Sequence, residues 1–206
     1  TNAAYTRKAE VYTSNDSATS AAVTKYTSIE VSTGGRYSIN STNEMTIYSI
    51  NTPTNLSQGN SGIKFINTTT SVESDWLHSN GITNTSLSPN RRYAFNISTR
   101  NGDGEIRGTA DGGGKYTAIE RAYGATYETA ATSITIHSSN EPSNLASGES
   151  GILFENTNTG TNSGWVKTNT WINSSLTANT QYTYKITTRN GDGLVLGTLE
   201  GINGLK

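Results

Sequence analysis

The chain has 206 residues, a formal net charge of −1 and no cysteine, and half of its residues are Thr, Ser, Asn or Gly. The balanced charge gives no electrostatic attraction to nucleic acid, and the short apolar stretches predict no membrane insertion in this segment. The lack of cysteine excludes disulfides, thiolate nucleophiles and Cys-ligated zinc.

The residue usage favours an exported protein. Low charge combined with abundant Thr, Ser and Asn is typical of exported bacterial proteins, so we expect an extracellular, cell-surface location. The first residues lack the charged and apolar regions of a signal peptide, which predicts a mature or excised fragment.

A tandem repeat organises the chain. At an offset of 89 residues, the segment 46–104 aligns with 135–193 without a gap, and 30 of the 59 positions are identical. A match of this quality predicts two homologous units. The matched positions include a proline, a phenylalanine, a tryptophan, a tyrosine and a closing Arg-Asn-Gly-Asp-Gly, namely Pro53 with Pro142, Phe65 with Phe154, Trp76 with Trp165, Tyr93 with Tyr182, and 100–104 with 189–193.

The alignment also sets the predicted domain boundaries. A second match, shifted by one residue, places 26–30 over 116–120. We therefore predict a first repeat over 26–115 and a second over 116–206. Residues 1–25 are predicted to be the tail of a preceding repeat or a linker, because the polar run 14–17 precedes Tyr26 much as 100–104 precedes Tyr116.

Each repeat carries the patterns of short β-strands. Alternation of apolar and polar residues is typical of a strand with one buried face, and Asn, Ser, Gly and Pro bound the strands. This pattern predicts strands over 93–98, 133–137, 151–155 and 182–188. No segment has the apolar spacing of a core helix, so the fold class is all-β, with tandem seven-stranded antiparallel sandwiches.

A hairpin is predicted where each repeat closes. Asn101-Gly102 and Asn190-Gly191 lie between two strand patterns, and Asn-Gly favours the two positive-φ positions of a type I′ turn. The glycine after the following aspartate is suited to a bulge.

The segments 87–101 and 176–190 resemble the fibronectin type III pattern, in which a Leu-x-Pro-x-Thr-x-Tyr linker leads into a strand and an Asn-Gly hairpin follows. The resemblance implies a fibronectin type III or Ig-like sandwich, and a tyrosine corner made by Tyr93 and Tyr182. The Asn-x-Pro, Gly-Ile-x-Phe and Thr-Arg-Asn-Gly-Asp-Gly segments further resemble repeats of large exported bacterial surface proteins, including surface-layer proteins.

Calcium is the only metal that the sequence suggests, and otherwise no cofactor is expected. Carboxylate and amide oxygens suit Ca²⁺, and acidic residues recur at matched positions near the repeat boundaries. The candidate ligands are Asp103, Asp192, Glu30 and Glu120. No catalytic residues are expected, because the acids are scattered and no known nucleophile or metalloenzyme motif occurs.

Two further kinds of candidate site remain open. Trp165 and Trp171 could stack against a sugar, although packing against the core is the simpler use of scarce aromatic rings. Asn84 and Asn173 are the only Asn-x-Ser/Thr sequons at matched positions, which makes them candidate glycosylation sites.

These observations lead to one functional prediction and an alternative. The leading hypothesis is a non-catalytic structural or interaction segment of a large cell-surface protein, acting as a spacer or lattice element of a surface layer. The alternative is a glycan-binding or adhesion module, or accessory domains of an extracellular hydrolase. The expected partners are neighbouring repeats or copies of the same protein, and cell-wall or surface glycans.

Overall fold

A computed structural model describes residues 2–12 and 17–203. Within these residues every regular element is a β-strand, so none of them forms a helix that could cross a membrane. The chain divides into two compact units. The first comprises Thr1–Ser38, Thr46–Thr83 and Tyr93–Gly114, and the second comprises Ile39–Met45, Asn84–Arg92 and Lys115–Lys206.

Each repeat forms two antiparallel sheets of three and four strands, which confirms the predicted all-β class with seven-stranded sandwiches. The three-stranded sheet of the first repeat is β5-β6-β9, with β5 Gly35–Ile39, β6 Met45–Ser49 and β9 Gly81–Asn84. Its four-stranded sheet is β11-β10-β7-β8, with β7 Gly62–Asn67, β8 Val72–Glu73, β10 Arg92–Arg100 and β11 Ile106–Tyr116.

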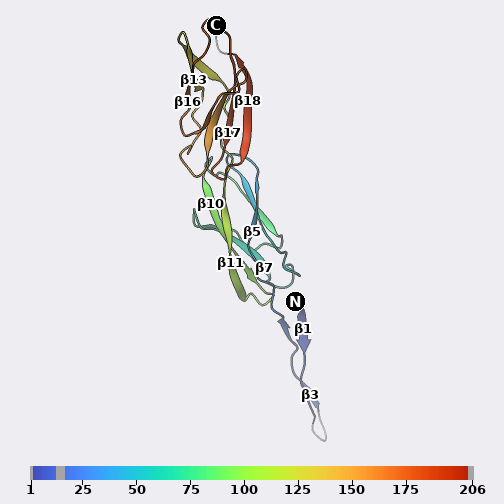
Figure 1. Cartoon of the computed structure of the whole chain (residues 1–206). Helices are drawn as coiled ribbons and strands as arrows, with labels where there is room; N and C mark the ends of the chain where they lie inside the picture. The colour runs from blue at the N-terminus through green and yellow to red at the C-terminus, as the bar shows by residue number, and fades with distance from the viewer. Residues whose placement is uncertain (1, 13–16, 204–206) are drawn as a thin grey trace. The chain divides into compact units, whose positions relative to one another are not determined.

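The second repeat has the same topology. Its three-stranded sheet is β12-β13-β16, with β12 Ala125–Thr129, β13 Ser133–Ser138 and β16 Thr170–Ser174. Its four-stranded sheet is β15-β14-β17-β18, with β14 Gly151–Asn156, β15 Asn162–Val166, β17 Thr183–Arg189 and β18 Val195–Asn203. The β17–β18 pair forms a long hairpin that is easily followed in Figure 1.

The core of each sandwich consists of the inward residues of the alternating strands. In the second repeat, Ile152 and Phe154 of β14 pair with the strand that carries Tyr184 and Ile186, and all four side chains are fully buried. In the first repeat, Ile63, Phe65, Phe95 and Ile97 fill the matching positions. Burial of each such side chain contributes about 1.5–3 kcal/mol, and so a few large residues stabilise a polar chain.

The N-terminal residues form a hairpin of their own. In it β1 Ala4–Arg7 pairs with β4 Val23–Tyr26, and β2 Glu10–Tyr12 pairs with β3 Ser17–Thr19. The polar run 14–17, on which the prediction for residues 1–25 partly rests, lies mostly outside the described residues. This hairpin has the connectivity of β10–β11 and β17–β18, and the assignment of residues 1–25 to a preceding repeat stays a prediction.

The Asn-Gly hairpins do not have the predicted type I′ geometry. Asn101 and Gly102 have negative φ, and so do Asn190 and Gly191; positive φ falls on Gly104 and Gly193, at 84° and 78°. The amide of Gly104 donates to the carbonyl of Asn101 at 2.9 Å, as the amide of Gly193 does to Asn190. These are type I turns followed by a glycine bulge, so the hairpins and the bulge were predicted correctly and the type I′ geometry was wrong.

The hydroxyl of Tyr127 on β12 gives a prediction about alkaline pH. It is buried with no hydrogen-bond partner among the described residues, and burial, together with the nearby Tyr184, raises the pKa of Tyr127 to about 12. Because the unfolded chain ionises near pH 10, the folded protein should lose stability between pH 10 and 12. Urea denaturation should show that Tyr127→Phe loses less stability between pH 10 and 12 than the unmodified chain does. An equal loss of stability in the variant would show that Tyr127 is not its cause.

Candidate functional site at two equivalent repeat junctions

The candidate site is built around two asparagines whose backbone lies in the left-handed region. Asn2 precedes β1 with φ of 43°, and Asn90 precedes β10 with φ of 45°. Asparagine tolerates this region better than most residues because its short amide can bond locally. Both side chains are fully buried, which is uncommon for a loop asparagine and requires that the amide be hydrogen-bonded.

The amide of Asn90 joins two loops within the second compact unit. Its Nδ2 donates to the carbonyl of Asn144 at 2.8 Å, and its Oδ1 accepts from the amide of Gly191, also at 2.8 Å. The backbone amide of Asn90 donates to the carbonyl of Ala118 at 2.9 Å. One side chain therefore links the loop after β13 to the β17–β18 turn.

Asn2 makes the same set of bonds within the first compact unit. Its Nδ2 donates to the carbonyl of Asn55 at 2.7 Å, and its Oδ1 accepts from the amide of Gly102 at 3.0 Å. Its backbone amide donates to the carbonyl of Ser28 at 2.8 Å. Asn55 and Gly102 match Asn144 and Gly191 in the repeat alignment, so the two junctions are equivalent atom for atom.

A threonine beside each asparagine extends the junction along the backbone. The amide of Thr117 donates to the carbonyl of Arg91 at 3.1 Å, and the Thr117 hydroxyl donates to the carbonyl of Ser88 at 2.7 Å. At the other junction, the amide of Thr27 donates to the carbonyl of Ala3 at 3.0 Å. The entry segment of each repeat is thus held like a short added strand.

The Asn-Gly-Asp-Gly turn receives the tyrosine that opens each repeat. A Cβ placed on Gly191 would lie 2.5 Å from ring atoms of Tyr116, and one on Gly102 would lie 2.4 Å from the ring of Tyr26. Glycine is therefore required here for close packing rather than for positive φ. The Asp192 carboxylate accepts the amide of Tyr116 at 2.9 Å, as the Asp103 carboxylate accepts the amide of Tyr26 at 3.1 Å.

The four acidic residues proposed as calcium ligands make hydrogen bonds within their own junctions. In addition to the bonds of Asp103 and Asp192, Glu30 accepts the amide of Thr54 at 3.0 Å, and Glu120 accepts the amide of Ser143 at 3.0 Å. Across the described part of the chain, no three His, Asp or Glu side chains are grouped so that they could hold a metal ion. Calcium binding stays a prediction without a gathered ligand set.

The two tyrosines of the implied tyrosine corner are both buried at the start of the strand that follows the linker. Tyr93 is 2% exposed and Tyr182 is 7% exposed. The hydroxyl of Tyr182 accepts the backbone amide of Thr177 at 2.9 Å, five residues upstream. This bond fixes the path of the 177–182 loop.

Trp165 and Trp171 lie on strands of different sheets in the second repeat. Trp165 on β15 lies under the guanidinium of Arg189, 4.4 Å from the ring centroid. Trp171 on β16 packs inward against Phe154 and Tyr184, with ring centroids 6.5 and 6.3 Å apart. The two rings therefore do not form one sugar-binding platform.

The amide nitrogens of the matched sequons are buried, and glycosylation at these sites stays a prediction. Asn173 is 2% exposed, and its Nδ2 donates to the hydroxyl of Tyr184 at 3.2 Å. The Nδ2 of Asn84 is also buried. A glycan on either amide nitrogen would have to displace core packing, so these residues are structural in the folded chain.

The sequence interpretation missed Asn2 and Asn90. The available signal was an Asn-x-x-Tyr motif that occurs as Asn2 with Tyr5, Asn90 with Tyr93, and Asn179 with Tyr182. A repeated loop asparagine is usually explained as a turn residue, and nothing in one repeat alone indicates that its amide is buried by loops from the next.

No protein-family model matches the chain, and no curated protein matches it either. Among solved structures, a two-domain fibronectin type III segment of chicken tenascin matches with a TM-score of 0.47 and 10% identity, covering 83% of this chain and 99% of that one. The FN1–FN3 domains of chicken CNTN1 match with a TM-score of 0.34 and 14% identity, covering 95% and 75% respectively. Both matches are tandem fibronectin type III domains, and the sandwich architecture of this chain rests on its own strand pairing.

Proposed function

We propose that this chain is a non-catalytic structural segment in which consecutive fibronectin type III-like repeats are joined through buried asparagines. The observation that carries the proposal is the construction of one hydrogen-bonded junction twice, around Asn2 and around Asn90. A repeat held to its neighbour by its backbone and a buried amide has less freedom than one on a flexible linker. Restricted motion is what a spacer or lattice element requires.

The matched polar residues support a structural rather than a catalytic role. In both repeats the shared acids accept backbone amides of the junction, so their duplication is explained by the repeated architecture. Catalysis by paired carboxylates would instead need two acids facing one cleft.

The setting we propose is the surface of a bacterial cell, in a surface layer or a similar assembly. The support is the composition: half of the residues are small and polar or glycine, and the net charge is −1. Such faces pack against identical neighbours without strong electrostatic repulsion. Ordered sheets of the full-length parent protein in electron micrographs would support this setting, and a parent chain with an attached catalytic domain would favour an accessory module instead.

The joined-repeat proposal is tested by ¹⁵N relaxation of the intact chain. Amides of β7 and β10 report on the first sandwich, and amides of β14 and β17 report on the second. Equal rotational correlation times for the two sets are expected, and Asn90→Gly should make them diverge. Independent tumbling of the two sandwiches in the unmodified chain would contradict the proposal.

A further inference from the structure

We infer that the surface around Asn179 is a third, open junction that docks the entry segment of another repeat of the same kind. Asn179 lies between Ala178 and Thr180 with φ of 53°, in the same conformation as Asn2 and Asn90. Unlike those two side chains, it is exposed. The inference extends the proposed joining function and rests on it.

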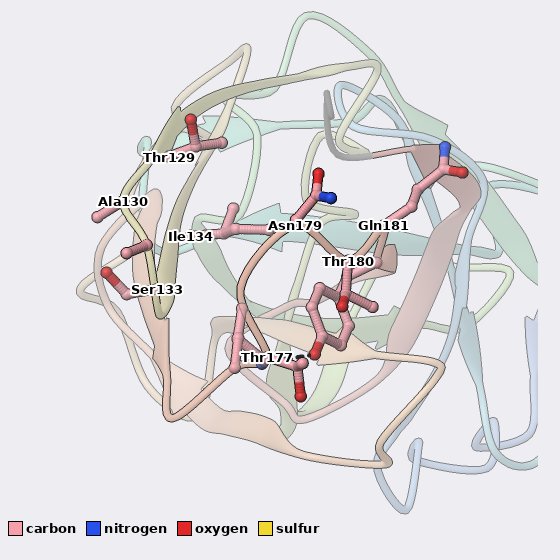
Figure 2. A pocket seen from close by; sticks show the side chains of 11 residues that line it. Thr129, Ala130, Ser133, Ile134, Thr177, Asn179, Thr180 and Gln181 are labelled. Carbon is pink, nitrogen blue, oxygen red and sulfur yellow. Dashed lines mark hydrogen bonds between the residues drawn. The ribbon is translucent and has the colours of Figure 1, made fainter.

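The surface is a preformed hollow in the second repeat. A hollow of about 330 Å³ is lined by the β12–β13 turn and the loop before β17. Figure 2 shows Ile134 and Asn179 lining it, with Thr129 and Ser133 toward one side and Thr180 and Gln181 toward the other. Ile134, Leu176 and Tyr182 supply its apolar lining.

The matching residues of the first repeat identify what the hollow would hold. At an offset of 89 residues, its lining falls within 40–45 and 87–93, and nearly all of these positions lie in the segments Ile39–Met45 and Asn84–Arg92 that belong to the second compact unit. There Ala118 donates to the carbonyl of Ser41 at 3.2 Å, and Met45, the counterpart of Ile134, is fully buried. The occupant of this position is the entry segment 116–120 of the second repeat, of which Thr117 and Ala118 bond to the lining.

The groups that make the junction bonds are present in the second repeat as well, although the two repeats differ in sequence there. Pro89, Arg91 and Arg92 are replaced by Ala178, Thr180 and Gln181. However, the junction bonds of the first repeat use its backbone and the asparagine amide, and both are retained. The partner of the hollow is therefore a Tyr-Thr-(Ala or Ser)-Ile-Glu segment. It is accompanied by two loops of its own repeat, the one that corresponds to Asn144 and the Asn-Gly-Asp-Gly turn.

The experiment extends the full chain by a second copy of residues 116–206, so that Tyr116 of the added copy follows Lys206. Asn179 is then changed to glycine either in the inner copy, where the added repeat would cover it, or in the terminal copy, where it stays exposed. The inner substitution should lower the equilibrium constant for folding, measured by urea denaturation, roughly 30-fold or more. The terminal substitution should lower it by no more than about fivefold, which is the effect of the freedom that glycine adds to the unfolded chain.

Equal effects of the inner and terminal substitutions would overturn the inference, as would failure of the added repeat to fold while Asn179 is intact. Asn90→Gly in the same extended chain separates this failure from that of the proposed function. If Asn90→Gly is destabilising and the inner Asn179→Gly is silent, only the open junction is rejected. If both are silent, the joining role of the asparagines fails altogether.

Discussion

Asn90→Gly should lower the free energy of unfolding by about 2–4 kcal/mol. The substitution removes the bond to the Asn144 carbonyl and leaves the buried Gly191 amide without its acceptor. A lost neutral hydrogen bond costs about 0.5–1.5 kcal/mol, and an unsatisfied buried amide costs about 1–3 kcal/mol. Glycine adopts the φ of 45° without strain, so the measured change reports the lost amide rather than a distorted backbone.

Asn179→Gly is the matched control, because Asn179 has a φ of 53° and an exposed side chain. Both substitutions add the same freedom to the unfolded chain, about 0.5–1 kcal/mol, which cancels in the difference between them. Urea denaturation followed by tryptophan fluorescence measures both variants. Equal destabilisation by the two substitutions would show that Asn90 contributes nothing beyond its loop conformation.

Gly191→Ala should cost about 2–3 kcal/mol, for a steric reason. The new methyl carbon would lie 2.5–2.7 Å from three atoms of the Tyr116 ring, well inside van der Waals contact. Overpacking of this kind costs about 1–3 kcal/mol, and displacement of the turn would also disturb the bond from the Gly191 amide to Asn90. Thermal or urea denaturation of the variant gives the cost directly.

A double-mutant cycle with Tyr116→Ala separates the steric effect from other causes. Removal of the ring removes the three atoms nearest to the added methyl group, so Gly191→Ala should cost under about 1 kcal/mol in that background. Gly160→Ala reports the separate cost of placing alanine at a positive φ, because its φ is 75° and no atom lies within 4 Å of its Cβ position. If Gly191→Ala costs the same with and without the ring, the close approach of Tyr116 is not the reason for the glycine.

The sequence predicted the features that are set by residues close together in one repeat. Alternation located the strands around Phe154, Ile186 and their counterparts, because a strand with one buried face imposes period two on the side chains. The bulge glycines Gly104 and Gly193 were predicted from the chemistry of the turn itself, which also depends only on neighbouring residues. The type I′ assignment failed because Gly102 and Gly191 are needed for packing against a tyrosine distant in sequence, which a local pattern does not reveal.

Features that depend on distant segments could not be predicted in this way. The sequon at Asn173 looked like a surface site until β16 placed its amide against Tyr184 in the core. The carboxylates of Asp103 and Asp192 looked like hard metal ligands, and the fold directs them to the backbone amides of Tyr26 and Tyr116, which open the same repeats. The Asn-x-x-Tyr motif marks Asn90 but does not reveal its burial, because its partners, Asn144 and Gly191, lie 54 and 101 residues away.

If a buried asparagine holds each junction, amide hydrogen exchange at Gly191 should report it, because that amide donates to the side chain of Asn90. Gly102 provides an internal reference, because its amide donates to Asn2 in the equivalent junction. We predict that both amides are strongly protected in the intact chain, and that Asn90→Gly abolishes protection at Gly191 while leaving Gly102 protected. Exchange of the Gly191 amide at the rate of an unstructured peptide in the unmodified chain would contradict the account.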